Sequence, residues 1–431
     1  MKSLLFVMIL KSTLALLLRP IAPFRTTTVK LFSSQPARKF RSFPFPYHSE
    51  MVVEIESLTS LGQGVARVPL PAADAESHDG ENRWVVFVPS VLPGETVRVR
   101  VFRNDKTFSD ADLVEVITPS PDRVEPKCKL YTECGGCQYQ HISIAQQRRF
   151  KQQQVVDVFA RHNYLDCEGD ILKQHRNSLP VAETIGTDEQ YGYRSKITPH
   201  YNPPPREAEF TSDAFGPIGF HRKSSRMLVD VDKCIIATDH INRELNNVRK
   251  DVVDGWGERV KFLEEKNKNK KPKNRRKGLA NTLLLREVYG GKVVSDPNQV
   301  VREVVNGMKF EFKAGNFWQN NPFLLPKMVD HVIDRAFAGV NNSSTKSTHL
   351  IDTYCGSGLF AICAAKKFEQ VAGIEVNAMA IDEAKRNAIL NDIGNASFLA
   401  AEAEKIFDTD VRDYPRDETT VICDPPRKGV R

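Results

Sequence analysis

Acidic residues are missing from the first 49 positions of this 431-residue sequence, although the whole chain contains 54 of them. The same stretch is rich in basic residues, serine and threonine, which is typical of peptides that direct proteins to organelles. We therefore expect residues 1–47 to be a transit peptide or disordered. The mitochondrion is favoured over a plastid because arginine and serine dominate. The alternatives are a secretory signal and a disordered tail that has no targeting function. The basic residues are Lys2, Lys11, Arg19, Arg25, Lys30, Arg38, Lys39 and Arg41.

A long apolar run is also lacking. The stretch from Leu4 to Leu18 is interrupted by Lys11 and is shorter than the roughly 20 residues that a membrane-spanning helix requires. We therefore expect no membrane partner, and we expect a monomer. The composition, 41% hydrophobic and 27% charged, is ordinary for a globular protein of two or three domains. A net charge of +7 permits a polyanionic partner without identifying one.

Cysteine is scarce, because eight cysteines in 431 residues are too few for a secreted disulfide scaffold. Three of them nevertheless cluster at Cys128, Cys134 and Cys137, with a Gly-Gly turn between the last two. Such a loop can direct several thiols at one metal centre. Cys234 is our choice for the fourth ligand, and Cys167 is its competitor. The spacing alone is equally compatible with a zinc site and an iron–sulfur cluster.

The third glycine of the dinucleotide-binding fingerprint is absent from residues 350–362. These residues have the pattern of a strand, a tight loop with Gly356 and Gly358, and a helix. Such glycines allow close approach of a ligand, and the helix presents free N–H groups. Because Phe360 and Ala361 follow the loop, we favour an adenosine ligand without a pyrophosphate, such as S-adenosylmethionine (SAM).

Two further predicted strands end in acids. The strand at 371–375 ends in Glu375, about 20 residues after the glycines, where a doubly wound fold places the acid that binds ribose hydroxyls. The strand at 421–424 ends in Asp424, and two prolines follow it. These acids strengthen the prediction of a Rossmann-like nucleotide site.

Short alternating segments characterise the region before the cysteines. Residues 52–55, 84–88 and 97–101 are predicted strands. Several such strands in about 70 residues indicate an OB-like β-barrel, a common oligonucleotide-binding module. A barrel without a partner is the plain alternative. We therefore predict a multidomain α/β protein with a leader (1–47), the barrel (48–118), a central α+β domain with the cysteines (119–315) and a Rossmann-like domain (316–431).

Candidate nucleic-acid contacts lie in the central domain. Tyr193, Arg194 and Lys196 could meet an RNA strand by stacking and charge, or could line a solvated strand face. The basic insertion at 266–277 is either a phosphate contact or a solvated loop. Residues 317–319, Phe-Trp-Gln, are candidates for a ligand wall, with aromatic core packing as the alternative.

Together these motifs resemble the RNA uracil-5-methyltransferase family, which includes bacterial tRNA and 23S rRNA uracil methylases. The segment with GQGVAR and VPSVLPGETVRVRV resembles a TRAM domain, an RNA-binding accessory domain of this family. The other matching segments are CKLYTECGGCQYQH, GYRSKI, GNFWQNNP, IDTYCGSGLFAI, VAGIEVNAMAIDEAKRNAILN and VICDPPRKGV.

The resemblance implies roles for single residues. It implies SAM as cofactor, with Gln319 and Tyr354 beside it, Glu375 on the ribose hydroxyls and Asp424 near the methyl donor and the target base. Gly356 and Gly358 would form the cofactor loop. The cysteines resemble those of the rRNA-type branch, which implies a [4Fe–4S] cluster on Cys128, Cys134, Cys137 and Cys234.

The catalytic residues of the family are not present in residues 1–431. Methylation at C5 of uracil requires a thiolate that adds to C6 and a base that removes the C5 proton. In the family, both follow Asp-Pro-Pro-Arg, the cysteine in Ser-Cys-Asn/Asp-Pro and the glutamate in His-x-Glu. We therefore expect a C-terminally truncated chain without turnover, its nucleophile and base lying downstream of Arg431.

Two other functions remain open. A non-catalytic RNA-binding protein could retain the barrel and the cluster. A cytosine-5 RNA methyltransferase is disfavoured, because many of those carry cysteine directly after Asp-Pro-Pro, where Arg427 stands here. The choice between tRNA and rRNA also remains open.

Overall fold

The computed structural model describes residues 43–70, 83–161, 181–202, 215–269, 281–338, 347–403, 405 and 410–425. These residues form two compact units. The N-terminal unit extends to residue 188 and includes residues 220–229, and the C-terminal unit comprises residues 189–219 and those from 230 onwards. Several features of the sequence analysis lie outside the described residues: residues 1–42 of the predicted leader, Cys167, most of the basic insertion and Arg427.

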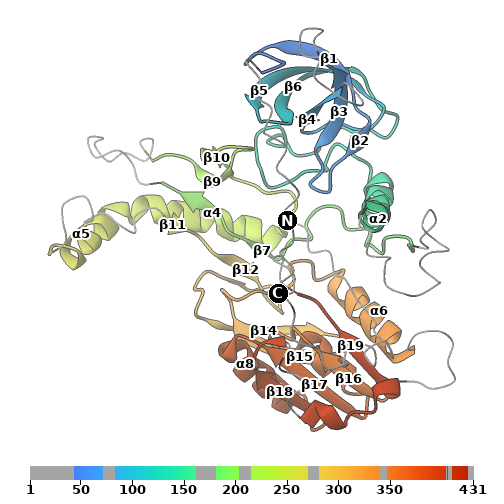
Figure 1. Cartoon of the computed structure of the whole chain (residues 1–431). Helices are drawn as coiled ribbons and strands as arrows, with labels where there is room; N and C mark the ends of the chain where they lie inside the picture. Colours follow the sequence, from blue (N-terminus) through green and yellow to red (C-terminus); the bar gives the residue numbers. More distant parts are fainter. Residues whose placement is uncertain are drawn as a thin grey trace. The chain divides into compact units, whose positions relative to one another are not determined.

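A curled six-stranded sheet forms the first part of the N-terminal unit (Figure 1). Val97, Val99 and Val101 point into its core, whereas Arg98 and Arg100 alternate with them on the outer face. Register shifts along β5 and β6 add the bends that curl a sheet. In sheet order the strands are β1 (Glu50–Glu54), β5 (Thr96–Asn104), β6 (Phe108–Thr118), β4 (Arg83–Val88), β3 (Gly64–Pro69) and β2 (Ser57–Leu58). The three strands predicted from sequence are therefore confirmed as β1, β4 and β5.

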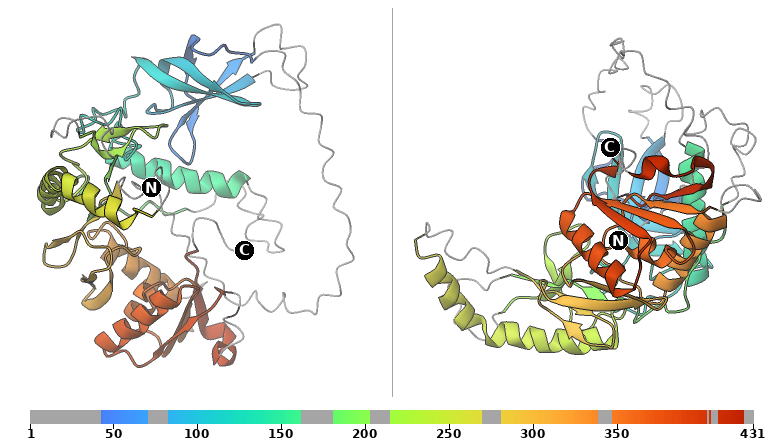
Figure 2. Two further views of the ribbon diagram at one scale, coloured as in Figure 1. Left: turned by 90° about the vertical axis from the view of Figure 1, so that its left-hand side faces the viewer. Right: turned by 90° about the horizontal axis from the view of Figure 1, so that it is seen from below.

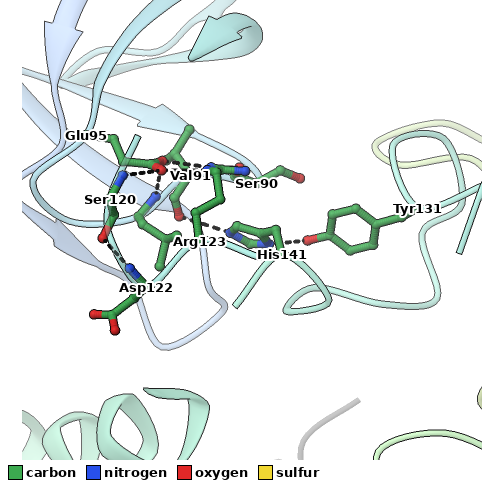
Figure 3. Close-up of polar contacts among 9 residues, drawn as sticks. Ser90, Val91, Glu95, Ser120, Asp122, Arg123, Tyr131 and His141 are labelled. Carbon is green, nitrogen blue, oxygen red and sulfur yellow. Dashed lines mark hydrogen bonds and ion pairs between the residues drawn. The ribbon is translucent and has the colours of Figure 1, made fainter. Parts of the chain in front are cut away.

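A buried carboxylate joins this sheet to the segment that follows it (Figure 3). Glu95 is fully buried and accepts hydrogen bonds from Leu92 N (2.8 Å) and Ser120 N (3.1 Å). Arg123 donates to it through Nε (2.5 Å) and Nη2 (2.7 Å). Burial raises the pKa of Glu95, but the bonds from Arg123, Ser120 and Leu92 outweigh it, so the pKa lies below its ordinary value.

A buried histidine fixes the cysteine-containing segment to the same sheet. His141 Nδ1 lies 2.5 Å from Tyr131 Oη, and Nε2 lies 3.3 Å from the Val91 carbonyl (Figure 3). Burial lowers the pKa of His141 to about 4, so the ring is neutral at physiological pH. Because a carbonyl only accepts, the proton of the neutral ring on Nε2 is donated to Val91 O.

The glutamine-rich face of helix α2 (Ile144–Arg161) is structural. Gln154 donates to the carbonyl of Thr59 (3.1 Å) in a turn of the barrel. Gln152 donates to the carbonyl of Val181 (2.6 Å).

Among the helices that the structure describes, none combines the length and the apolar character of a membrane span.

Small sheets and a helical arm follow along the chain; the strands between residues 218 and 230 lie partly in the N-terminal unit, but most of these elements belong to the C-terminal unit. Two helices follow one another, and α5 extends away from the sheets of this unit (Figures 1 and 2). Strands β12 and β13 pair as a hairpin around residues 289–291. The elements are β7 (Lys196–Ile197), β8 (His200–Tyr201), β9 (Ile218–His221), β10 (Leu228–Asp230), α4 (Asp239–Asp254), α5 (Trp256–Lys266), β11 (Asn281–Thr282), β12 (Leu285–Glu287), β13 (Val293–Val294), β14 (Val300–Val305) and β15 (Met308–Lys313).

A parallel sheet with the order β18-β17-β16-β19 completes this unit. Its central strands are apolar and buried, as expected for a sheet covered on both faces. The order agrees with the predicted doubly wound fold. The elements are α6 (Leu325–Ala338), β16 (His349–Asp352), α7 (Leu359–Ala364), β17 (Gln370–Glu375), α8 (Ala378–Leu390), β18 (Ala396–Ala400), the short 3-10 helices Asp410–Asp413 and Arg416–Glu418, and β19 (Thr419–Ile422).

We predict that Arg123→Met lowers the free energy of unfolding by about 3 kcal/mol, because it leaves the Glu95 carboxylate buried without its cation. Since the pKa of folded Glu95 lies below 4.5, its contribution is present above that pH and is lost as the pH falls through the folded pKa. The variant should therefore lose less stability than the wild type on acidification below pH 4.5. Urea unfolding at several pH values measures both effects.

Arg98→Met is the matched control. It removes an exposed ion pair with Glu115 (3.3 Å), which should contribute less than about 1 kcal/mol. Equal effects of the two substitutions would contradict the role assigned to Glu95.

Candidate functional site

Three acids meet at one edge of the parallel sheet. Asp352 ends β16, Glu375 ends β17, and Asp424 follows β19. The strands pair in parallel, with Asp352 opposite Gly373 on one side and Ile422 on the other. The carboxyl ends of parallel strands form the ligand-binding edge of such folds. The structure therefore brings together the acids that the sequence placed at separate strand ends.

Asp352 is the most unusual of these groups. Its side chain is fully buried, and neither carboxylate oxygen has a hydrogen-bond partner. The pKa of Asp352 is raised to about 7, chiefly by burial and also by the charges of Asp424 and Glu375, while nearby backbone N–H groups oppose the increase. Burial also raises the pKa of Asp424. A buried polar group without a partner is costly, and such groups concentrate at functional sites.

The loop after β16 requires its two glycines. Gly356 and Gly358 have φ values of +52° and +90°, in the left-handed region that other residues rarely adopt. A side chain at Gly358 would come within 2.8 Å of Ile362, so the loop packs closely on α7. A Cβ at Gly356 would meet no atom within 4 Å. The loop therefore has an open side at Gly356, beside the acids.

Helix α8 holds the glycine loop through two buried polar side chains. Glu383 Oε2 accepts a hydrogen bond from Ser357 Oγ (2.8 Å). Glu383 Oε1 accepts from Asn316 Nδ2 (2.9 Å) and from Lys313 N (3.2 Å). Asn387 donates to the carbonyl of Ser357 (3.1 Å). The glycine loop is thereby connected to the segment that carries Gln319.

The sequence analysis missed these residues. Asn387 also accepts from Glu311 N (2.7 Å), and Asn391 both accepts from Lys309 N (2.8 Å) and donates to Lys309 O (2.7 Å). The available signal was the spacing of Glu383, Asn387 and Asn391, which places three polar side chains on one helical stripe. Nothing in that spacing distinguishes a buried polar stripe from a solvated one.

The predicted ligand wall at residues 317–319 divides into separate roles. Trp318 is a core residue that stacks on Phe312, with ring centroids 4.6 Å apart. Phe317 is 73% exposed, and Gln319 is half-buried. Tyr354, also half-buried, precedes the glycine loop.

The predicted RNA contacts lie beside the same segment. Ser195 N donates to the carbonyl of Asn320 (2.9 Å), and Lys196 Nζ donates to the carbonyl of Gly315 (3.3 Å). Arg194 Nε donates to the carbonyl of Lys196 (2.9 Å), and Tyr193 is half-buried. The pKa of Lys196 is lowered to about 8, chiefly by burial and also by the neighbouring cations Arg286 and Arg194. The structure thus brings Lys196 and the segment of Gln319 together.

The cysteines do not form a ready metal site. Cys128, Cys134 and Cys137 belong to the N-terminal unit, and Cys234 belongs to the C-terminal unit; all four side chains are half-buried. Burial raises the pKa of Cys134, and the nearby thiols raise it further. Within the described ranges, no group of three or more His, Cys, Asp or Glu side chains could hold a metal ion. The metal hypothesis therefore still depends on spacing and resemblance.

Two family models match the chain. The one described as tRNA (Uracil-5-)-methyltransferase matches residues 250–431, and the TRAM domain matches residues 48–114.

Relatives from yeasts match across almost the whole chain. A "tRNA (uracil(54)-C(5))-methyltransferase" of Schizosaccharomyces pombe is 33% identical over 396 residues, which cover 90% of this chain and 66% of that protein. The protein of the same name from Saccharomyces cerevisiae is 30% identical over 438 residues, covering 89% of this chain and 63% of that protein. The chain thus spans slightly less than two thirds of the length of these relatives.

The fold is shared with a solved structure. The Pyrococcus abyssi tRNA (uracil-54, C5)-methyltransferase, crystallised in complex with S-adenosyl-L-homocysteine, superposes with a TM-score of 0.55 at 21% identity. The match covers 88% of this chain and 85% of that one. By its family match, its relatives and its fold, this chain belongs to the tRNA (uracil-5-)-methyltransferase family, with a TRAM domain and a SAM methyltransferase fold.

Proposed function

We propose that this chain provides the cofactor-binding and RNA-binding parts of an enzyme that methylates C5 of uracil in RNA, with SAM as methyl donor. The observation that carries the proposal is the meeting of Asp352, Glu375 and Asp424 beside an open glycine loop. The names of the yeast relatives favour tRNA over rRNA as the substrate.

The residues at this edge suit SAM in shape and charge. SAM supplies a methyl group on a positively charged sulfur. Glu375 is accessible at the end of β17 and can accept hydrogen bonds from the ribose hydroxyls. Val376, 71% exposed, offers an apolar face for the adenine. Burial raises the pKa of both Asp352 and Asp424, and a cationic ligand beside them would favour their charged forms because opposite charges attract.

The RNA would approach from the side of β7. Tyr193, Arg194 and Lys196 adjoin the segment that carries Gln319, so a base held there would lie near the cofactor edge. Stacking on tyrosine and charge from the basic side chains suit a single-stranded RNA segment. The TRAM barrel would provide a further RNA contact.

For the chemistry we propose covalent catalysis. A thiolate adds to C6 of uracil, C5 then attacks the methyl group, a base removes the C5 proton, and the thiolate leaves. Residues 1–431 contain neither family motif that supplies the thiol and the base.

Glu375→Ala should weaken SAM binding about 10- to 100-fold, because hydrogen bonds to a charged acceptor contribute about 1.5–3 kcal/mol. Isothermal titration calorimetry with SAM and S-adenosylhomocysteine measures this. Asp382→Ala, an exposed acid on α8, is the control and should leave both affinities unchanged. If the wild-type chain binds neither compound, the alternative of a non-catalytic RNA-binding protein is favoured instead.

The 431-residue chain should bind SAM and tRNA without producing 5-methyluridine. Mass spectrometry of nucleosides from an unmodified tRNA transcript, after incubation with the chain and SAM, tests this. Formation of 5-methyluridine would contradict the assignment of the nucleophile and base to motifs that residues 1–431 lack.

We also propose a metal centre on Cys128, Cys134, Cys137 and Cys234, an iron–sulfur cluster or alternatively zinc. The chain purified without oxygen should contain about four irons or one zinc, and Cys134→Ser should remove them. Cys363→Ser, a half-buried thiol on α7, is the control. An equal metal content in both variants would contradict the proposal.

The composition of residues 1–49 leads us to propose a mitochondrial destination, with a plastid as the alternative. The location of a fluorescent protein fused after these residues would distinguish the two.

A further inference from the structure

Two cations face each other across a short ladder near the candidate site. Arg286 on β12 pairs directly with Lys196 on β7, so both side chains lie on the same face. Like charges in directly opposite positions destabilise a ladder. Arg286 is only 1% exposed, and burial lowers its pKa to about 10. The repulsion between the two charges and the cost of burying Arg286 must therefore be offset by favourable contacts with neighbouring groups.

The compensation comes from three consecutive backbone carbonyls. Arg286 donates through Nε to Ala314 O (2.8 Å) and through Nη2 to Asn316 O (2.9 Å). Lys196 donates to the carbonyl between them, that of Gly315 (3.3 Å). Hydrogen bonds from charged donors are stronger than those between neutral groups. The two cations therefore hold the backbone at the start of segment 314–320 in place by hydrogen bonds.

Other groups give only weak compensation. Glu303 is the carboxylate whose charge favours the charged form of Arg286. Burial raises the pKa of Glu303 itself to about 7, so it is only partly ionised at neutral pH. The guanidinium carbon of Arg286 also lies 5.3 Å from the centroid of the Phe312 ring. The carbonyls remain the direct partners of both cations.

Hydrogen bonds connect segment 314–320 to the glycine loop. The side chain of Asn316 donates to Glu383, and Glu383 accepts from Ser357 in that loop. At the other end of the segment, Asn320 O accepts from Ser195 N, next to Lys196. Displacement at the carbonyls of 314–316 would therefore reach both Gln319 and the glycine loop.

We propose that Arg286 and Lys196 are positioning residues, which hold segment 314–320 so that Gln319 and the glycine loop are aligned for the cofactor. Neither cation needs to touch the cofactor. The proposal deepens the function proposed above and depends on it only for the identity of the cofactor.

Lys196→Met should increase hydrogen exchange of the amides in 314–320 and at Ser357 and Gly358 by about fivefold, and should raise the Kd for SAM about 5- to 10-fold, by the loss of one charge-assisted bond. Lys196→Arg should stay within about twofold of the wild type. Lys292→Met, an exposed lysine beside the same small sheet, should change neither quantity. Hydrogen exchange by mass spectrometry and calorimetry measure the two effects.

The pH dependence separates this role from simple packing. With a pKa near 8, Lys196 is charged below that pH and becomes a neutral, weaker donor above it, while the facing Arg286, with a pKa near 10, remains mostly charged at pH 9. The ratio of the wild-type Kd for SAM to the Kd of Lys196→Arg should therefore rise between pH 7 and pH 9, because the titration of Asp352 and Glu303, whose pKa values are both about 7, is common to the two proteins. Arg286→Lys should loosen the segment further, but Lys196 decides the test because the burial of Arg286 makes its variants prone to unfolding.

The outcomes are distinct. Unchanged exchange in Lys196→Met, or a loosened segment with unchanged SAM affinity, overturns the proposal. Unchanged exchange with weaker RNA binding overturns it too and assigns Lys196 to the RNA instead. If the wild type binds no SAM, the proposed function fails, and the exchange data still decide whether the two cations hold the segment and the glycine loop.

Discussion

A single buried carboxylate, that of Glu383, connects the parts from which the candidate site is built. It accepts hydrogen bonds from β15, from the side chain of Asn316 and from Ser357 in the glycine loop. A carboxylate buried without hydrogen bonds is strongly unfavourable. The requirement to satisfy Glu383 therefore fixes the positions of three segments at once, and the alignment of loop and sheet edge depends on it.

The same helix covers an edge that would otherwise be exposed. Strand β15 pairs with β14 on one side only, and an unpaired strand edge promotes association with other chains. Asn387 on α8 and Asn391, which caps the C-terminus of this helix, both donate to and accept from the backbone of β15, at Glu311 and Lys309. The side-chain amides thus replace a neighbouring strand, and they join the β14–β15 hairpin to the parallel sheet.

The N-terminal unit uses a related solution. Glu95 collects donors from its own turn, from the segment after β6 and from Arg123. In the C-terminal unit the sign of the charge is reversed, because the buried cation Arg286 donates hydrogen bonds to two backbone carbonyls. In each case one charged group holds a loop in place through several hydrogen bonds. The segment held by Arg286 carries Gln319, which is proposed for cofactor recognition.

The sequence by itself determined the local elements and the family. Strand alternation, the Gly356–Gly358 loop and the acids at or just after the ends of β16, β17 and β19 depend on neighbouring residues, which is why short patterns identify them. Only the tertiary structure decided which polar residues are buried and what they hold. Asn316 and Glu383 are 67 positions apart, and Lys196 and Gly315 are 119 apart. Because no local pattern distinguishes a buried Glu or Arg from a solvated one, only the packing of distant segments could assign these residues to the site.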